Sequence, residues 1–200
     1  MKSTLNIKLT LIKIIFAILS ANVIATPSFN MAYVGGQGNL SDTACYIRSD
    51  NGQPYFNIVS IFAASIKGTT PSAPTIQFNN NVTSLLDSAL TPGSQVYNLR
   101  AKGIKVLLTV MGGHAQAGWS CFTKQADAES FAKQLVAITN QYGLDGIDID
   151  DEYSNCTAES TSLIMVTQAI KNDTGFNGKI LTKALYSDSK YFKATYNLHS

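Results

Sequence analysis

The sequence contains little of several residue types, and each shortage argues against a class of protein. Only 14% of its 200 residues are charged and the formal net charge is +2, which is too close to zero to indicate a nucleic-acid-binding surface. Three cysteines and two histidines occur, with no Cys-x-x-Cys pair, so no zinc site is predicted. No glycine-rich nucleotide-binding motif follows a strand-like segment. We therefore expect no metal, no other cofactor and no nucleic-acid partner.

The composition is otherwise that of a globular protein. Hydrophobic residues make up 45% of the chain, which is enough for a sizeable core, and the length suggests about one domain. The sequence shows no internal repeat, no long run of charge and no low-complexity segment. These features leave the oligomeric state open.

The first 25 residues have the pattern of a secretory signal peptide. Lys2, Lys8 and Lys13 precede the apolar run IIFAILSANVIA, which is too short to span about 30 Å of hydrocarbon comfortably. A buried N-terminal helix is the competing interpretation. We expect cleavage after Ala25, a secreted domain of residues 26–200, and no stable membrane insertion afterwards. An oxidising compartment allows one disulfide among the three cysteines, and the sequence leaves its pairing open.

Strand-like and helix-like segments alternate along the rest of the chain. This order is typical of βα units with a parallel sheet, and the strand-like segments are nearly continuous apolar runs, as expected when both sheet faces are covered. An open doubly wound sheet and a (β/α)₈ barrel both fit. The expected strands are 29–34, 55–66, 104–113, 144–150 and 179–186, and the expected helices are 82–90, 94–103, 127–143 and 159–172.

The strand-like segment that ends in GIDIDDE is unusually acidic, because five of the chain's 13 acidic residues lie between positions 145 and 152. Side chains alternate between faces in a strand, so Ile147 and Ile149 share one face, and Asp148, Asp150 and Glu152 share the other. Neighbouring carboxylates cannot all ionise cheaply, which raises at least one pKa. A carboxylic acid that is still protonated near neutral pH can act as a general acid, and glycoside hydrolysis often uses such a group.

Three other interpretations of this segment fit its residues less well. A calcium-binding EF-hand loop needs glycine at its sixth position, where Tyr153 stands when the loop is counted from Asp148. A metal-binding Asp-x-Asp pair of a nucleotide-sugar transferase fits locally but lacks partners for a phosphate. A solvated acidic loop does not explain the alternation with isoleucine. We expect Asp145 to be a turn or backbone acceptor and Asp151 to have a polar surface role.

These residues resemble a known family. DGIDIDDE is similar to the DGxDxDxE signature of glycoside hydrolase family 18, which contains chitinases and endo-β-N-acetylglucosaminidases. Further segments resemble the endo-β-N-acetylglucosaminidase H type: IFAASI, IKVLLTVMGGHAQAGW, SFAKQLV, and the aspartate and tyrosine that flank Glu152. The likeness runs from about Met31 to Leu185.

The resemblance implies a TIM barrel with the acidic strand as its fourth, and acids at the carboxyl end of that strand. It also implies substrate-assisted retaining hydrolysis. Glu152 would protonate the leaving oxygen, Asp150 would orient the substrate acetamide, and Asp148 would share a proton with Asp150.

Three aromatic residues near the ends of these strands could contact sugar. Tyr153 and His114 lie just beyond strand ends, and Trp119 is the chain's one tryptophan, on a loop flanked by glycine. An aromatic face packs well against a pyranose ring. Ordinary loop packing is the competing interpretation for all three.

The chain departs from the family pattern in length. Five strands are recognisable, whereas the family barrel has eight, so we expect an α/β barrel that is truncated after about five βα units. Residues 26–200 would be the N-terminal part of the catalytic barrel. The expected activity is cleavage of the GlcNAc-GlcNAc core of N-linked glycans. The alternatives are a chitinase acting on chitin-like GlcNAc oligosaccharides and a non-catalytic carbohydrate-binding protein.

Overall fold

The computed structural model describes residues 29–35 and 37–185, and the predicted signal peptide lies outside them. The strands are β1 (Met31–Gly35), β2 (Ile58–Lys67), β3 (Thr75–Gln77), β4 (Lys105–Gly112), β5 (Gly146–Asp150) and β6 (Ile180–Lys183). The α-helices are α1 (Asn80–Asp87), α2 (Gln95–Ala101), α3 (Gln125–Gln141) and α4 (Ser162–Asn172), with short 3₁₀ helices at Leu40–Cys45 and Thr174–Phe176. All five predicted strands and all four predicted helices are present, with ends shifted by a few residues.

The strands form one sheet in the order β1-β2-β4-β5-β6, in which every neighbouring pair is parallel. The short strand β3 is not among the five strands predicted from the sequence. It pairs antiparallel with the end of β2, and three residues are too few to show a periodic pattern. The peptide between Phe62 and Ala63 in β2 is cis, at an irregularity in the pairing with β4.

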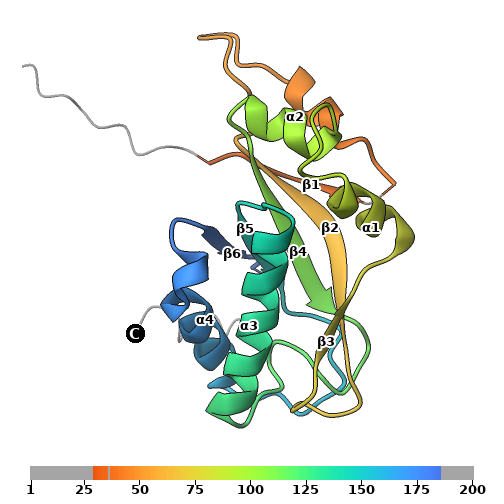
Figure 1. Ribbon diagram of the computed structural model, residues 1–200. Helices are drawn as coiled ribbons and strands as arrows, with labels where there is room; N and C mark the ends of the chain where they lie inside the picture. Colours follow the sequence, from red (N-terminus) through yellow and green to blue (C-terminus); the bar gives the residue numbers. More distant parts are fainter. Residues whose placement is uncertain (1–28, 36, 186–200) are drawn as a thin grey trace, which may run out of the picture.

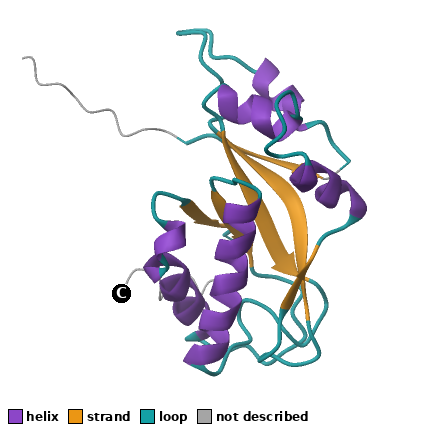
Figure 2. Cartoon of the chain, in the orientation of Figure 1, coloured by secondary structure: helices purple, strands orange, loops and turns teal. Residues whose placement is uncertain are grey.

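The helices pack on one face of the sheet, and α3 and α4 lie side by side in front of β5 and β6 (Figures 1 and 2). One buried cluster joins apolar helix residues to strand residues that share a face, among them Leu135 of α3, Val166 of α4, Leu108 of β4 and Ile147 of β5. An open doubly wound sheet would carry helices on both faces. The one-sided arrangement therefore agrees with the barrel rather than with the open sheet.

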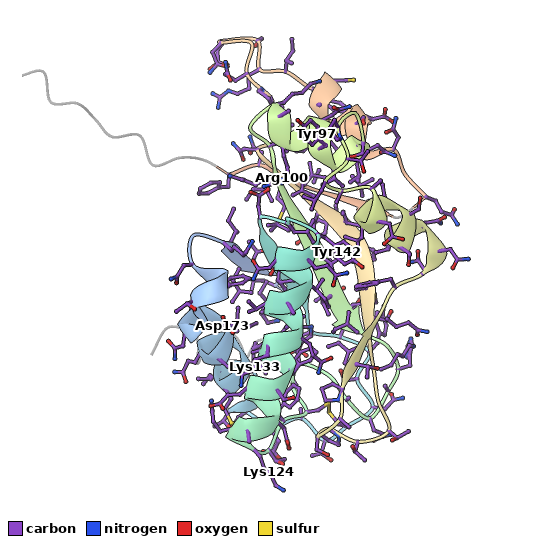
Figure 3. The ribbon with its side chains drawn as sticks, viewed as in Figure 1. Tyr97, Arg100, Lys124, Lys133, Tyr142 and Asp173 are labelled. Carbon is purple, nitrogen blue, oxygen red and sulfur yellow. A yellow bond between two sulfur atoms is a disulfide. The ribbon has the colours of Figure 1, made fainter. Side chains whose placement is uncertain are left out.

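Helix α3 shows why these segments fold as they do. Phe131 and Leu135 are fully buried and Ile138 packs against the same core, whereas Lys133 projects from the outer side of the helix (Figure 3). Gly143 follows the helix end with φ of 61°, a left-handed conformation that glycine adopts without steric cost. The predicted helix is therefore confirmed, with an apolar stripe toward the core and a glycine after its end. No helix within the two described ranges is long and apolar enough to cross a membrane.

Candidate active site

The predicted acids lie at the carboxyl end of β5, on the sheet face that the helices do not cover. Asp148 is fully buried and Asp150 is 3% exposed. The hydroxyl of Tyr33 on β1 donates to Asp148 Oδ1 at 3.3 Å, although β2 and β4 separate these two strands. Across a flat sheet the two backbones would be about 14 Å apart, too far for the side chains to meet. The sheet therefore curls around its acidic face, as in a barrel.

Asp148 accepts hydrogen bonds from hydroxyl groups on three other strands, one of which is that of Tyr33. Thr182 Oγ1 on β6 donates to Oδ1 at 2.6 Å, and Thr109 Oγ1 on β4 donates to Oδ2 at 3.0 Å. Ser60 Oγ on β2 lies 2.6 Å from Thr109 Oγ1 and so supports it from behind. None of these hydroxyl residues is among the site residues predicted from the sequence. Each could have been noticed as a polar residue within a strand, on the same face as the acids.

Burial is the main cause that raises the pKa of Asp148, and the nearby charge of Asp150 raises it further, while the three hydroxyl donors act in the opposite direction. Burial, followed by the charge of Asp148, also raises the pKa of Tyr33 to about 12. Tyr33 therefore stays a proton donor at neutral pH. A raised pKa of Asp148 beside Asp150 agrees in direction with the proton sharing implied by the family resemblance.

The raised pKa of Asp148 predicts a pH-dependent stability. The native carboxyl group keeps its proton to a higher pH than in the unfolded chain, where the pKa is about 3.9. Its contribution to stability is therefore present below that value and is lost as the pH rises through the folded pKa. Asp148→Asn cannot ionise, so its free energy of unfolding should improve relative to wild type across this pH window. Urea unfolding at a series of pH values measures the difference, and a difference independent of pH would contradict the prediction.

Glu152 lies two residues beyond the end of β5, and its backbone N–H donates to the Asp150 carbonyl at 3.1 Å. Its side chain is partly buried. The backbone of Gly112 at the end of β4 lies so close that a Cβ atom there would overlap the Glu152 carbonyl oxygen. The acid is therefore positioned by direct packing of the end of β4 against the chain that carries it.

The remaining two aspartates of the acidic stretch have separate structural roles. Asp145 accepts from the backbone N–H of Val106 at 3.0 Å and pairs with Arg100 and Lys105 at 3.1 and 3.2 Å, which confirms its prediction as a backbone acceptor. The prediction of a surface role for Asp151 was wrong, because Asp151 is 1% exposed. Its carboxylate accepts a 2.6 Å hydrogen bond from Ser120 Oγ, a partner that strand parity does not reveal.

Two loops meet above the acids: the β4 loop (residues 113–124) and the β5 loop (residues 151–161). Backbone hydrogen bonds join them along their length, and a disulfide links Cys121 to Cys156. The inter-loop backbone bonds run from His114 N to Tyr153 O, from Asn155 N to Ala115 O and from Glu159 N to Ser120 O, each at 2.8 Å. The β5 loop begins at Asp151 and carries Glu152, so these links also restrain the predicted acid.

Removing this disulfide should destabilise the protein. The two cysteines are 35 residues apart, and closing such a loop restricts the unfolded chain by about 3–4 kcal/mol in the chain-entropy model. The double variant Cys121→Ala/Cys156→Ala should therefore lower the free energy of unfolding by about 2–4 kcal/mol in urea titrations. Cys45→Ala is the matched control, because Cys45 is free and exposed. An equal loss in the control would argue against the disulfide as the cause.

The prediction that Trp119 stacks on sugar is wrong. Its ring is fully buried, its Nε1 donates to the Val110 carbonyl at 2.7 Å, and it packs edge-on against Phe131 with centroids 5.3 Å apart. Trp119 lies on the β4 loop, as expected from the sequence, but this loop turns the ring into the core beneath α3. His114 and Tyr153, by contrast, are exposed and lie beside each other.

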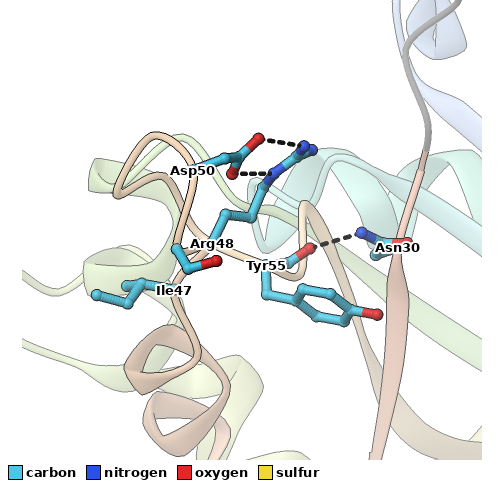
Figure 4. Close-up of a pocket in the computed structure, with 6 residues that line it drawn as sticks. Asn30, Ile47, Arg48, Asp50 and Tyr55 are labelled. Carbon is cyan, nitrogen blue, oxygen red and sulfur yellow. Dashed lines mark hydrogen bonds and ion pairs between the residues drawn. The ribbon is translucent and has the colours of Figure 1, made fainter.

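A hollow of about 440 Å³ lies elsewhere on the molecule and is lined by residues that include Asn30, Arg48, Asp50 and Tyr55 (Figure 4). Asn30 precedes β1 and Tyr55 precedes β2, so the hollow is at the amino ends of the parallel strands, opposite the acids. Arg48 and Asp50 form an exposed ion pair there. The hollow is therefore not part of the acidic site.

Across the described part of the chain, no three histidine, cysteine or acidic side chains are grouped to hold one metal ion.

The chain is similar in sequence to two curated endo-β-N-acetylglucosaminidases over about half of its length. An endo-β-N-acetylglucosaminidase of Flavobacterium sp. (strain SK1022) is 46% identical over 112 residues, which cover 56% of this chain and 34% of that protein. Endo-β-N-acetylglucosaminidase F1 of Elizabethkingia meningoseptica is 34% identical over 106 residues, or 52% of this chain and 30% of the relative. The chain thus spans about a third of the length of these curated relatives.

The fold has a matching solved structure. The crystal structure of Bacteroides thetaiotamicron EndoBT-3987 with Man5GlcNAc product superposes with a TM-score of 0.66 at 24% identity, covering 82% of this chain and 41% of that one. The model of glycosyl hydrolases family 18 matches residues 30–200. A parallel sheet with helices on one face, a curled acidic interior and this match over most of the sequence lead to one conclusion: the chain belongs to glycosyl hydrolase family 18.

Proposed function

We propose that this chain is part of a secreted endo-β-N-acetylglucosaminidase that hydrolyses the β-1,4 bond between the two GlcNAc residues of the N-glycan core. The observation that carries the proposal is the acidic end of β5, where Asp148 is buried among hydroxyl donors, Asp150 is also buried and Glu152 follows two residues after the strand. The identity to two endo-β-N-acetylglucosaminidases over about half of the chain supports this substrate.

In the proposed reaction Glu152 donates its proton to the glycosidic oxygen as the bond to the anomeric carbon breaks. The carbonyl oxygen of the substrate's own 2-acetamido group forms a bond to that carbon, giving a cyclic oxazolinium intermediate. Asp150 accepts a hydrogen bond from the acetamide N–H and stabilises the positive charge. The Glu152 carboxylate then takes a proton from water, whose oxygen bonds to the anomeric carbon as the bond between that carbon and the acetamide oxygen breaks, so the configuration is retained overall.

Asp148 acts through Asp150 in this scheme. Its burial favours the protonated form, so it can donate a hydrogen bond to Asp150 when Asp150 is ionised. As the positive charge develops on the substrate, Asp150 must remain an anion, and a neutral neighbour costs less than a second carboxylate. The three hydroxyl groups around Asp148 fix its orientation for this role.

A comparison of two substrates tests the proposal. A high-mannose glycopeptide and a chitooligosaccharide of similar size are incubated with the protein, and the products are resolved by mass spectrometry. Release of a glycan that ends in one GlcNAc, with the second GlcNAc left on the peptide, is the expected result. Preferential cleavage of the chitooligosaccharide would support a chitinase instead, and binding of both without turnover would support a carbohydrate-binding protein.

Export is the remaining part of the proposal. The basic and apolar N-terminal segment has the pattern of a signal peptide, and the Cys121–Cys156 disulfide is of a kind that persists in oxidising compartments. Expression in a secreting host should yield a chain that begins at Thr26, as read by N-terminal sequencing. A chain that stays in the cell with its first 25 residues attached would overturn this part alone.

A further inference from the structure

We propose that the rings of His114 and Tyr153 form an aromatic platform that binds the sugar on the leaving-group side of the scissile bond, the GlcNAc that stays attached to the peptide. This inference rests on the proposed role of Glu152 as the proton donor. It adds a subsite and two side chains whose part in binding can be measured without turnover.

The two rings are presented together by the ends of adjacent strands. His114 follows β4 and Tyr153 follows β5, and their ring centroids are 4.9 Å apart with planes inclined by 42°. The His114 N–H donates to the Tyr153 carbonyl at 2.8 Å, and the Asn155 side-chain amide donates to the His114 carbonyl at 2.7 Å. The backbone under the rings is therefore fixed, so little freedom would be lost when a ligand binds.

The backbone at both positions is in an unfavourable conformation. His114 and Tyr153 have φ of 56° and 57°, and among the described residues no other non-glycine residue has a positive φ. This region is uncommon for non-glycine residues, although asparagine, aspartate and histidine enter it more readily than tyrosine, and such strain persists mainly at binding sites and active sites. Burial does not explain it, because Tyr153 is 46% exposed. The conformation aims two large rings toward solvent beside the acids.

The order of residues along the chain assigns the platform to one side of the bond. Asp150 is deepest, at the strand end, and would meet the acetamide of the sugar that forms the intermediate. Glu152 donates to the oxygen of the departing sugar, so that sugar leaves from its side. Tyr153 is the next residue outward and is paired with His114. A pyranose presents an apolar face of C–H groups that packs on aromatic rings, and the imidazole can also exchange a hydrogen bond with a sugar hydroxyl.

Proton NMR can test the platform, because the chain contains two histidines, His114 and His199, and one tryptophan. The folded protein is titrated with N-acetylglucosaminyl-asparagine, and the imidazole C–H signals are followed, with His114→Asn used to assign them. We expect the His114 signals to shift in a saturable manner while the His199 signals stay unchanged. The emission of the buried Trp119 confirms in each sample that the protein is folded.

Variants at position 153 separate the ring from the backbone. Tyr153→Asn removes the ring but tolerates the left-handed conformation, so it should weaken binding by about fivefold or more without unfolding the protein. Tyr153→Phe keeps the ring and should retain the affinity. Tyr97→Asn is the matched surface control, since Tyr97 is an exposed tyrosine on α2. Asp150→Asn should also leave the His114 shift in place, because the leaving-group sugar does not contact Asp150.

Two results would overturn the platform. One is the absence of a saturable His114 shift in folded wild type up to about 50 mM ligand, a concentration well above a Kd of millimolar order. The other is an unchanged affinity in Tyr153→Asn. Either result, together with normal glycan release by wild type, rejects the platform but keeps the proposed function. A saturable His114 shift in a protein that releases no glycan would keep the platform but reject the proposed function.

Discussion

Replacing Glu152 with glutamine should lower the rate of glycan release by about 10²- to 10⁴-fold, the range that a general acid contributes. Glutamine has nearly the same shape as glutamate but has no carboxylic proton to give to the leaving oxygen. The side chain is only partly buried, so the substitution should leave the fold intact. Initial rates on a high-mannose glycopeptide, with released glycan quantified by mass spectrometry, measure the effect.

Glu129→Gln is the matched control for this experiment. Glu129 lies on the exposed side of α3, where its carboxylate accepts a hydrogen bond from Gln125 one turn earlier, and its loss should leave the rate unchanged. Calorimetry on Glu152→Gln should still detect glycan binding, because the acid acts on the transition state more than on the bound substrate. Undiminished release by Glu152→Gln would reject the assigned mechanism.

Replacing Trp119 with alanine should lower the free energy of unfolding by about 3–5 kcal/mol, as for other large aromatic side chains removed from a core. The ring is fully buried against Phe131, so its removal leaves a cavity. It also removes the 2.7 Å hydrogen bond that the indole N–H donates to the Val110 carbonyl. Urea unfolding followed by circular dichroism measures the loss, since the variant has no tryptophan fluorescence.

Tyr97→Ala is the control for this prediction, because Tyr97 is 41% exposed on α2 and should cost far less. The two roles considered for Trp119 have different consequences. If the ring stacked on sugar, its replacement would lower the protein's affinity for carbohydrate and leave its stability unchanged. A variant with wild-type stability would therefore contradict the buried position that the structure gives to Trp119.

Sequence patterns could predict the elements and the acidic strand because both depend on local geometry. The alternation of side chains along a strand already separates Ile147 and Ile149 from Asp148 and Asp150, and the structure buries the isoleucines in the helix-covered core. The stripe on α3 and the glycine after it follow from the helical repeat and from the steric freedom of glycine. Strand β3 was missed because its three residues are too few to show the alternation of a strand.

The amino-acid pattern alone thus predicts the order of βα units, the parity of the acidic strand and the family resemblance of its motif. The surroundings of the acids depend on tertiary packing. The hydroxyl donors to Asp148 come from β1, β4 and β6, Asp151 is buried against Ser120, and Cys121 pairs with Cys156 rather than Cys45. Each of these contacts joins segments that lie far apart in the chain. They depend on how strongly the sheet curls and how two loops pack, which no local repeat in the sequence encodes.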